Sequence, residues 1–394
     1  MKTDASKIEE ILSRGVDEVI DREHLHKRML RGEKLRIKLG IDPTSPNIHI
    51  GRAIPLLKMR DFQELGHQIV LIIGDFTGLI GDTSDKESER PMLAEEKIKA
   101  NMKDYAKQAG KLLDMKKVEV RYNSEWLAKL DYEEIGKQAD QFSLAEFIAR
   151  ENIRKRLDEG RRISLRELLY PLLQGYDSVA IKADVELGGT DQRFNLLAGR
   201  TLQEFYKQQP QDILMTELIP GLDGRKMSSS WGNVINLMDE PNDMFGKVMS
   251  ITDDLIITYF THCTRFPMDK VAVYEKQLKA GKVNPRDIKI GLAFEIVKLY
   301  SDEKSAKEAK ENFISVFQKK EMPDEIEEVK IKGKEQNIVE ILILSKLATS
   351  KTDARRLIEQ KSVKIDGAVI GSIEMKVKKG DVIQKGKRFF VRIV

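Results

Sequence analysis

The chain has 394 residues, with 68 Lys and Arg, 64 Asp and Glu, one cysteine and an apolar share of 41%. This length and composition predict two or three domains with ordinary hydrophobic cores. The single Cys263 excludes an internal disulfide, and no Cys/His cluster has zinc-ligand spacing, so we expect no structural metal. The longest apolar runs are too short to cross a bilayer, and the N-terminus is not typical of a signal peptide. We therefore expect a cytoplasmic protein without a membrane partner.

The charge is distributed unevenly along the chain. From Ile331 to Val394 there are fifteen Lys and Arg against seven Asp and Glu, whereas the preceding part is mildly acidic. A basic module at one end of a chain indicates an anionic polymer as partner, although most charge runs form ordinary solvated surface.

Strand and helix patterns alternate in the first third, which predicts a parallel α/β sheet. Residues 68–74 form a continuous apolar run, typical of a strand buried on both faces. Segment 95–176 is largely helical and charged, so we interpret it as an insertion within the α/β domain. We expect strands at 35–41, 68–74, 118–122, 183–187 and 213–218, and a helix at 52–65.

Beyond residue 231 the pattern changes to helices, with a strong helix start at Asn284-Pro285-Arg286-Asp287. A charge-rich stretch around Pro323 reads as a linker. The last sixty residues predict a compact α-then-β unit with a helix near 351–360. The predicted parts are a Rossmann-like domain with a helical insertion (1–231), an α-helical domain (232–320), a linker (321–336) and a small α+β domain (337–394).

The first segment with chemical interest runs from Asp42 to Arg52 and joins a buried strand to a helix. Ligands of open α/β sheets bind at the carboxyl ends of strands, and a helix N-terminus attracts phosphate. His49 and Arg52 are three residues apart and share one helix face, while Gly51 lets a nucleotide approach the backbone. A lone histidine in a turn is more often structural than functional, so this segment alone is weak evidence.

The second segment is Lys226-Met227-Ser228-Ser229-Ser230, which follows the Gly-rich stretch 221–225. Cations and hydroxyls on a Gly-rich loop suit a clamp on a polyphosphate. In isolation such a pentapeptide is more often a solvated turn.

A third group of polar residues lies on a predicted helix. Tyr170, Gln174 and Asp177 stand at i, i+4 and i+7, which places them on one face. The flanking leucines indicate that this helix is largely buried, where polar groups need partners. A buried carboxylate and amide suit an amino acid that bears a phenol. After the next strand, Gly189 and Asp191 stand where a carboxylate can accept ribose hydroxyls.

Taken together, these segments resemble the class I aminoacyl-tRNA synthetases, whose HIGH and KMSKS signatures stand here as HIGR and KMSSS. From about Lys34 to the C-terminus the chain is similar to tyrosyl-tRNA synthetases. The resemblance implies activation of L-tyrosine by ATP and its transfer to the 3′-terminal adenosine of tRNA(Tyr). It also implies ATP with Mg2+ as substrate, no tightly bound cofactor, and a homodimer formed through the helical insertion.

The resemblance also implies roles for single residues. Asp177 would receive the tyrosine hydroxyl, and Gln192 would lie near the tyrosine carboxylate. The full tyrosine-binding set would be Lys38, Asp82, Tyr170, Gln174, Asp177 and Gln192. The ATP-binding set would be Asp42, Thr44, His49, Gly51, Gly189, Asp191, Lys226 and Met227. The catalytic set would be His49, Arg52, Lys86, Arg90, Lys226, Ser229 and Ser230.

Three positions depart from the family pattern. Arg52 replaces the second histidine of HIGH and can still donate to phosphate as a permanently charged fork. Ser229 replaces the second lysine of KMSKS, which removes a cation that Arg225, Lys86 or Arg90 would have to supply. Lys38 stands where many bacterial relatives carry a tyrosine. It would donate to the phenol oxygen or pair with Asp177, unless the alignment of this strand is off.

The C-terminal segment resembles a small RNA-binding domain named for a ribosomal small-subunit protein. Its basic residues would contact tRNA phosphates, with a solvated basic helix as the competing interpretation. Residues 232–318 correspond to the anticodon-recognition region of the family. The predicted tRNA-binding residues are Lys351, Arg355, Arg356, Lys361 and Lys364.

Two alternative functions stay open at this point. A non-catalytic RNA-binding protein on a synthetase scaffold is supported only by Arg52 and Ser229. A tryptophan-specific enzyme is disfavoured by Tyr170, Gln174 and Asp177.

Overall fold

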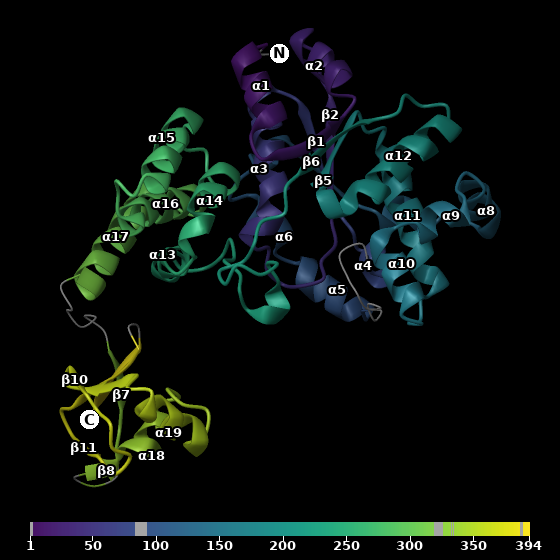
Figure 1. Ribbon diagram of the computed structural model, residues 1–394. Coiled ribbons are helices and arrows are strands. Elements are labelled where there is room, and N and C mark those ends of the chain that lie inside the picture. Colours follow the sequence, from purple (N-terminus) through teal and green to yellow (C-terminus); the bar gives the residue numbers. More distant parts are fainter. Residues whose placement is uncertain (1–2, 83–92, 319–325, 332, 334, 387–388) are drawn as a thin grey trace. The chain divides into compact units, whose positions relative to one another are not determined.

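The computed structural model describes residues 3–82, 93–318, 326–331, 333, 335–386 and 389–394 (Figure 1). The chain divides into two compact units, Met1–Lys307 and Glu308–Val394, and each is described by itself below. Across the described ranges, no helix is long and apolar enough to span a membrane.

A six-stranded sheet forms the centre of the first unit, in the order β1-β6-β5-β2-β3-β4. Strands β2 to β6 are parallel, and β1 pairs antiparallel with β6. This confirms the predicted α/β class. The bounds are β1 Val16–Ile20, β2 Arg36–Ile41, β3 Gln68–Ile73, β4 Val118–Tyr122, β5 Val185–Gly189 and β6 Asp212–Thr216.

Helices cover both faces of this sheet, with α3 on one face and α11 and α12 on the other (Figure 1). The segment 95–176, predicted as a helical insertion, is largely helical: it contains the short helices α5 to α10 and most of α11, and β4 interrupts it. The bounds are α1 Ala5–Ser13, α2 Arg22–Leu30, α3 Ile50–Leu65, α4 Thr77–Ile80, α5 Glu95–Met102, α6 Tyr105–Ala109, α7 Ser124–Leu127, α8 Tyr132–Ala139, α9 Leu144–Ile148, α10 Glu151–Asp158, α11 Leu165–Ile181 and α12 Arg193–Phe205.

Helix α11 carries the predicted polar face, and two features fix its position. Ser164 and Glu167 form a capping box that starts the helix. At its middle, a Cβ atom on Gly175 would lie 3.0 Å from the backbone carbon of Ala198 in α12. Because glycine leaves this space empty, the two helices pack backbone against backbone.

The helical region that follows β6 packs against the α/β body within the same unit. Arg265 forms an ion pair of 2.7 Å with Asp61 of α3, and the Arg14 guanidinium donates to the carbonyl of Phe260. The region begins with a short extended stretch. This stretch contacts the start of α3, where the Ile50 N–H donates to the carbonyl of Ile235. The helices of the region are α13 Pro241–Met249, α14 Ile256–Cys263, α15 Met268–Lys279 and α16 Pro285–Tyr300, while α17 Glu303–Gln318 begins in this unit and continues into the second.

The second unit encloses its own apolar core, which includes Ile341, Ile358, Val363 and Ile383. A five-stranded sheet of order β10-β9-β12-β13-β7 and a two-stranded sheet β11-β8 pack with two helices. The bounds are β7 Glu327–Val329, β8 Glu335–Asn337, α18 Ile338–Leu344, α19 Lys351–Glu359, β9 Val363–Ile365, β10 Ala368–Val369, β11 Lys376–Lys378, β12 Val382–Lys385 and β13 Phe389–Ile393.

One correction concerns the segment 321–336, which the sequence predicts as a linker. Within it, β7 pairs in parallel with β13, and β8 begins at Glu335. The two glutamates of β7 lie at the edge of the sheet and are exposed. Charged side chains on a short edge strand are common, and they hide the apolar alternation on which strand prediction depends.

Candidate active site

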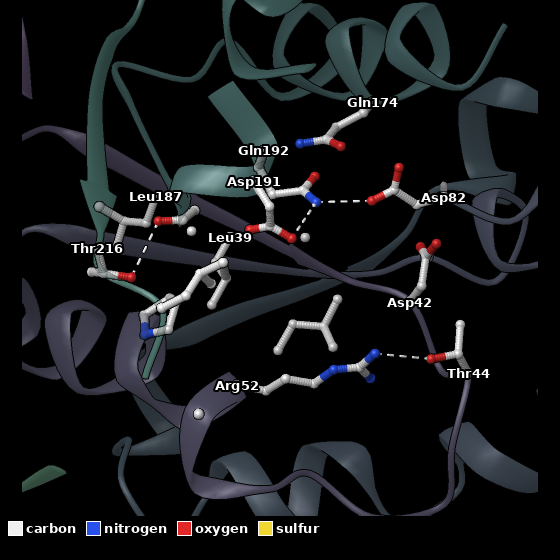
Figure 2. Close-up of a pocket in the computed structure, with 18 of the residues that line it drawn as sticks. Leu39, Asp42, Thr44, Arg52, Asp82, Gln174, Leu187, Asp191, Gln192 and Thr216 are labelled. Carbon is white, nitrogen blue, oxygen red and sulfur yellow. Dashed lines mark hydrogen bonds between the residues drawn. The ribbon is translucent and has the colours of Figure 1, made fainter. Parts of the chain in front are cut away.

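A cavity of about 470 Å³ opens at the carboxyl ends of β2, β3, β5 and β6 (Figure 2). Its walls come mainly from the stretch between β2 and the start of α3, the segment after β3, one face of α11, the end of β5 and the segment after β6. Five separate stretches of sequence therefore meet in one place. The predicted residues that line it are Asp42, Thr44, His49, Gly51, Arg52, Asp82, Tyr170, Gln174, Asp177, Gly189, Asp191, Gln192, Lys226, Met227 and Ser229.

Three predicted catalytic groups cannot be placed. Lys86 and Arg90 lie outside the described residues. The same holds for the side chain of Ser230, although its backbone belongs to the short 3-10 helix Ser229–Trp231.

His49 is buried at the N-terminus of α3, where its Nδ1 accepts the backbone N–H of Arg52 at 3.3 Å. Burial lowers the pKa of this imidazole to about 3, and the neighbouring Arg52 charge acts in the same direction. The ring is therefore neutral at physiological pH. Because Nδ1 accepts, we assign the ring proton to Nε2, which leaves a neutral donor on a residue of the cavity wall.

Arg52 projects from the same end of α3. Its Nη2 donates to the Thr44 hydroxyl at 3.1 Å (Figure 2). Its Nη1 is buried and has no hydrogen-bond partner among the described residues. A guanidinium with one arm anchored and a second arm available on a cavity wall is suited to an anion.

The Lys226–Ser229 segment closes the cavity from the other side. Met227 is buried, and a Cβ atom on Gly51 would lie 3.0 Å from its Sδ. The two signature segments therefore touch, and glycine at position 51 makes the contact possible. Lys226 and Ser229 line the cavity with exposed side chains.

Arg225 is already occupied in this structure. Its guanidinium donates to Asp223 at 2.5 Å and lies 5.1 Å from the Trp231 ring centre. Asp223 has its pKa lowered to about 2 by hydrogen bonds from Asn233 and Arg225. Arg225 therefore orders the loop, and a cation that replaces the missing lysine at 229 must come from elsewhere.

Asp177 forms the polar floor at the other end of the cavity. Its carboxylate is 3% exposed and accepts the indole N–H of Trp126 at 2.8 Å and the amide of Asn123 at 3.3 Å. Burial raises the pKa of this carboxyl to about 7, while the charge of Lys38 and the two hydrogen bonds oppose the rise. Asp177 is therefore poised between its two protonation states near neutral pH.

The placement of Lys38 corrects the sequence prediction, because this residue is not part of the cavity wall. Its side chain is fully buried, and Nζ lies 2.8 Å from Glu186 and donates to the Ser178 hydroxyl at 2.7 Å. The prediction offered a contact with the phenol oxygen or a pair with Asp177. The actual partner, Glu186 on β5, is 148 residues away in sequence, so spacing could not reveal it.

The remaining polar groups form a chain of hydrogen bonds along the wall. Gln192 donates to Asp82 at 2.8 Å, as Figure 2 shows, and accepts from Asn195 at 3.0 Å. Asn195 also donates to the side-chain amide oxygen, Oε1, of Gln174 at 3.1 Å. Tyr170 belongs to a separate branch, since its hydroxyl donates to Asp42 at 2.9 Å. Both glutamines are thus held in fixed orientations before any ligand arrives.

Sequence reasoning missed Asn123, which itself lines the cavity, and three groups that act from behind its wall, namely Trp126, Glu186 and Asn195. Each is a polar or aromatic residue in an ordinary helical or strand context, without a motif. Trp126 is one of only two tryptophans in the chain, yet nothing near it in sequence marks a carboxylate partner.

A cluster of Asp21, His24 and Asp212 lies at the amino end of β6, away from the cavity, with potential metal-ligand atoms within 4.8 Å of one another. His24 Nδ1 lies 2.9 Å from the Asp212 carboxylate, and an Arg28 nitrogen lies 3.9 Å from its other oxygen. Two cationic or donor groups already compensate the buried carboxylate, which makes an ion-pair cluster the simpler description.

The predicted RNA-binding side chains of the second unit lie mostly on its surface. Lys351, Arg355, Arg356 and Lys361 are exposed at helix α19 and the turn after it, and Lys364 is half-buried on β9. Arg356 pairs with Asp353 at 2.6 Å, which fixes its direction.

Two family models match the chain. The model described as "tRNA synthetases class I (W and Y)" matches residues 30–318, and the one described as "Tyrosine--tRNA ligase SYY-like C-terminal domain" matches residues 318–392. The chain is 47% identical to a tyrosine–tRNA ligase of Thermotoga maritima over 386 residues, covering 97% of this chain and 96% of that protein. It is 44% identical to a tyrosine–tRNA ligase of Dehalococcoides mccartyi over 396 residues, with complete coverage of both.

Solved structures are similar in fold. A C-terminally truncated mitochondrial tyrosyl-tRNA synthetase of Aspergillus nidulans matches with a TM-score of 0.66 and 21% identity, over 79% of this chain and 94% of that one. A tyrosyl-tRNA synthetase of Archaeoglobus fulgidus, solved in complex with L-tyrosine, matches with a TM-score of 0.62 and 24% identity, over 78% of this chain and all of that one.

Proposed function

This chain belongs to the tyrosine–tRNA ligases of the class I synthetase family, and we propose that the cavity at the carboxyl ends of its sheet is where it activates tyrosine. The enzyme joins L-tyrosine and ATP to tyrosyl-adenylate and transfers the tyrosyl group to tRNA, releasing pyrophosphate and AMP. The observation that supports the site is the meeting of both signature segments with the polar face of α11 in one cavity.

The end of the cavity near Asp177 fits the amino acid. A carboxylate that already accepts from Trp126 and Asn123 can accept one more hydrogen bond, from the tyrosine hydroxyl. Gln174 lies about one turn and Tyr170 about two turns from Asp177 on the same face of α11, with Asp82 opposite, and these groups suit an ammonium. Gln192 then lies near the tyrosine carboxylate.

The end near His49 fits the nucleotide. The Nε2 donor of His49, the second arm of Arg52 and the ammonium of Lys226 surround the space where phosphates would lie. Asp191 and Gly189, at the end of β5, suit the ribose. ATP enters as its magnesium salt, so part of the phosphate charge is neutralised by the substrate itself.

The mechanism depends on positioning and charge. The tyrosine carboxylate is already a nucleophile and attacks the α-phosphorus directly, so no side chain has to remove a proton from it. Negative charge builds up on the phosphates as pyrophosphate leaves, and His49, Arg52 and Lys226 stabilise that charge. The ribose hydroxyl of the tRNA then attacks the carbonyl carbon of the adenylate and expels AMP.

We assign the tRNA contacts by resemblance to the remaining parts of the chain. The helical region 232–320 would recognise the anticodon, and the exposed cations of α19 would contact phosphates. Of the predicted division, the catalytic domain (1–231), the helical domain (232–320) and a C-terminal RNA-binding domain stay a proposal, without the linker at 321–336.

A homodimer through the helical insertion and a cytoplasmic location also remain proposals. The insertion exposes several large apolar side chains, including Tyr132, which is 95% exposed, Leu144 and Leu165. Contiguous exposed apolar surface is typical of an interface between proteins.

A single-turnover measurement of adenylate formation tests the site. In Lys226→Met we expect the rate to fall by about 10²–10³-fold, because one charged contact to the transition state is lost, with an unchanged dissociation constant for tyrosine. Lys116→Met, which removes an exposed lysine next to β4, serves as the control. A normal rate in Lys226→Met would show that this segment does not hold the phosphates.

A further inference from the structure

An ion pair sealed behind the tyrosine end of the cavity has no part in the proposed chemistry. The side chains of Lys38 on β2 and Glu186 on β5 are 0% and 1% exposed, and Nζ lies 2.8 Å from Oε1. Neither residue lines the cavity. A buried pair of this kind often adds little stability compared with apolar side chains of the same size, so its presence calls for a functional reason.

Each partner of the pair is bonded to the turn of α11 that carries the pocket. Lys38 donates to the backbone carbonyl of Gln174 at 2.9 Å and to the Ser178 hydroxyl at 2.7 Å. Glu186 accepts from the Gln174 amide at 3.2 Å and from Ser178 at 3.0 Å. Asp177 lies between these two anchored residues, so the pair fixes the helix turn on both sides of it.

The pair also determines the charge that Asp177 experiences. Lys38 contributes the largest effect that lowers the pKa of Asp177, and Glu186 contributes a smaller effect that raises it. The Tyr170 hydroxyl on the same helix is neutral, because burial raises its pKa well above the ordinary value. Trp126 and Asn123 add uncharged donors. Lys38 is thus the cation that favours the carboxylate form among the groups facing Asp177.

We propose that the Lys38–Glu186 pair is a positioning and specificity device for the tyrosine hydroxyl. It orients Gln174 and shifts the protonation equilibrium of Asp177 toward the carboxylate form that accepts the phenol. This inference rests on the proposed function, since it assumes that tyrosine binds with its hydroxyl at Asp177. Residue 38 then acts on the tyrosine hydroxyl indirectly, through the position of α11 and through the charge of Asp177, and not by direct contact.

The test measures pyrophosphate exchange as a function of tyrosine concentration between pH 6 and 9. The variants are Lys38→Met and the double variant Lys38→Met/Glu186→Gln, which leaves no unpaired buried charge and therefore protects against misfolding. Lys289→Met is the matched control. Lys289 lies on α16, outside the cavity wall, and is also a buried lysine paired with a carboxylate, that of Asp253.

We expect Lys38→Met to raise the KM for tyrosine about tenfold at pH 7, since each unit by which the pKa of Asp177 rises leaves up to about a tenfold smaller carboxylate fraction. The double variant should raise this KM by a smaller factor, because the loss of Glu186 removes the opposing charge. Because a higher pH deprotonates Asp177 and so restores tyrosine binding, the increase in KM should become smaller as the pH approaches 9. The kcat and the KM for ATP should change less than threefold. The kcat/KM for phenylalanine, which shares the ammonium contact at Gln174 but offers no hydroxyl, should fall less than that for tyrosine and should not depend on the protonation of Asp177, so selectivity for tyrosine falls.

A purely structural pair predicts a different pattern, namely a lower melting temperature with an unchanged tyrosine KM and pH profile. That result in the folded double variant would overturn the inference. The wild-type enzyme is measured in the same assay. Absence of tyrosine-dependent exchange in the wild type would overturn the proposed function itself, and the two failures are therefore distinguishable.

Discussion

Asp177 is the residue to which we assign amino-acid selectivity. In Asp177→Asn the amide offers a weaker acceptor to the phenol, and an uncharged partner replaces a charge-assisted hydrogen bond. We expect kcat/KM for tyrosine to fall by roughly 10–100-fold, which corresponds to about 1.5–3 kcal/mol for a hydrogen bond to a charged group. Phenylalanine should be almost unaffected. Tyrosine–tRNA ligases are themselves the standard illustration of rejecting an analogue without the hydroxyl, so this direction is expected for any member.

The control is Asp212→Asn, because Asp212 is also a buried aspartate, at the amino end of β6 and outside the cavity wall. It should lower stability without altering the ratio of tyrosine to phenylalanine. An unchanged ratio in Asp177→Asn would instead place the phenol elsewhere.

Arg52 departs from the family signature, and its position on the cavity wall predicts a role in binding the phosphates of ATP. We expect Arg52→Ala to slow adenylate formation by about 10²–10³-fold in a single-turnover assay, because a preorganised charge on the phosphates is lost. Tyrosine binding should not change. Arg52→Lys keeps the charge but not the fork, so it should recover only part of the rate.

Lys58→Met provides the comparison within the same helix. Lys58 is buried in α3 and donates to the carbonyl of Ile11, outside the cavity wall. A defect in Lys58→Met as large as that in Arg52→Ala would mean that α3 is merely destabilised.

At the scale of single residues, sequence alone could predict the groups that belong to local motifs. His49, Lys226 and the face Tyr170–Gln174–Asp177 are recognisable from spacing of three to seven residues, and the structure brings all of them to one cavity. Lys38 was placed wrongly because its partner Glu186 is fixed only by the pairing of β2 with β5. Contacts that form across a sheet leave no trace in local spacing.

At the scale of elements, the crossing of α11 and α12 holds the polar face in register. Gly175→Ala introduces a methyl group 3.0–3.1 Å from backbone atoms of Ala198 and Gly199, which cannot move aside as a flexible side chain could. We expect a loss of about 1–3 kcal/mol in the free energy of unfolding by urea, together with weaker tyrosine binding.

Gly291→Ala is the matched control, since Gly291 is an exposed glycine inside α16 with no atom within 4 Å of the added Cβ. It should raise stability by about 0.5–1 kcal/mol, because alanine is the better helix former. Equal effects of the two substitutions would contradict the close packing of α11 on α12.

Helix α19 is the element that we assign to tRNA phosphates. In Arg355→Ala/Arg356→Ala we expect weaker tRNA binding in a filter assay and a salt dependence smaller by about one to two released ions. Pyrophosphate exchange without tRNA should be unchanged. Lys376→Ala/Lys378→Ala removes two exposed cations from β11 of the same unit and should have the smaller effect. The reverse order would move the RNA-binding face to that strand.

Element prediction succeeded where the apolar pattern is strong. The strand at 118–122 and the helix end at Leu65 were predicted as observed, because the alternating Val118 and Val120 and the glycine that follows the helix are clear signals. The strands β1 and β7 were missed. Both lie at sheet edges and are short and rich in acidic residues, so neither shows regular alternation.

At the scale of the whole molecule, the groups for tyrosine and for ATP lie within the unit Met1–Lys307, while the predicted phosphate contacts of α19 belong to the other unit. The fold class follows from the alternation of strands and helices, but the cavity exists only because five distant segments meet at one edge of the sheet. Its identity as a tyrosine site rests on all of them together.

The most direct test of this account is the tyrosine-dependent exchange of labelled pyrophosphate into ATP by the purified wild-type chain, with tryptophan and phenylalanine run in parallel. Exchange with tyrosine alone is the predicted result, and it would show that Arg52 and Ser229 are compatible with catalysis. Exchange with tryptophan instead, or with none of the three amino acids, would contradict the assignment of the cavity to tyrosine activation.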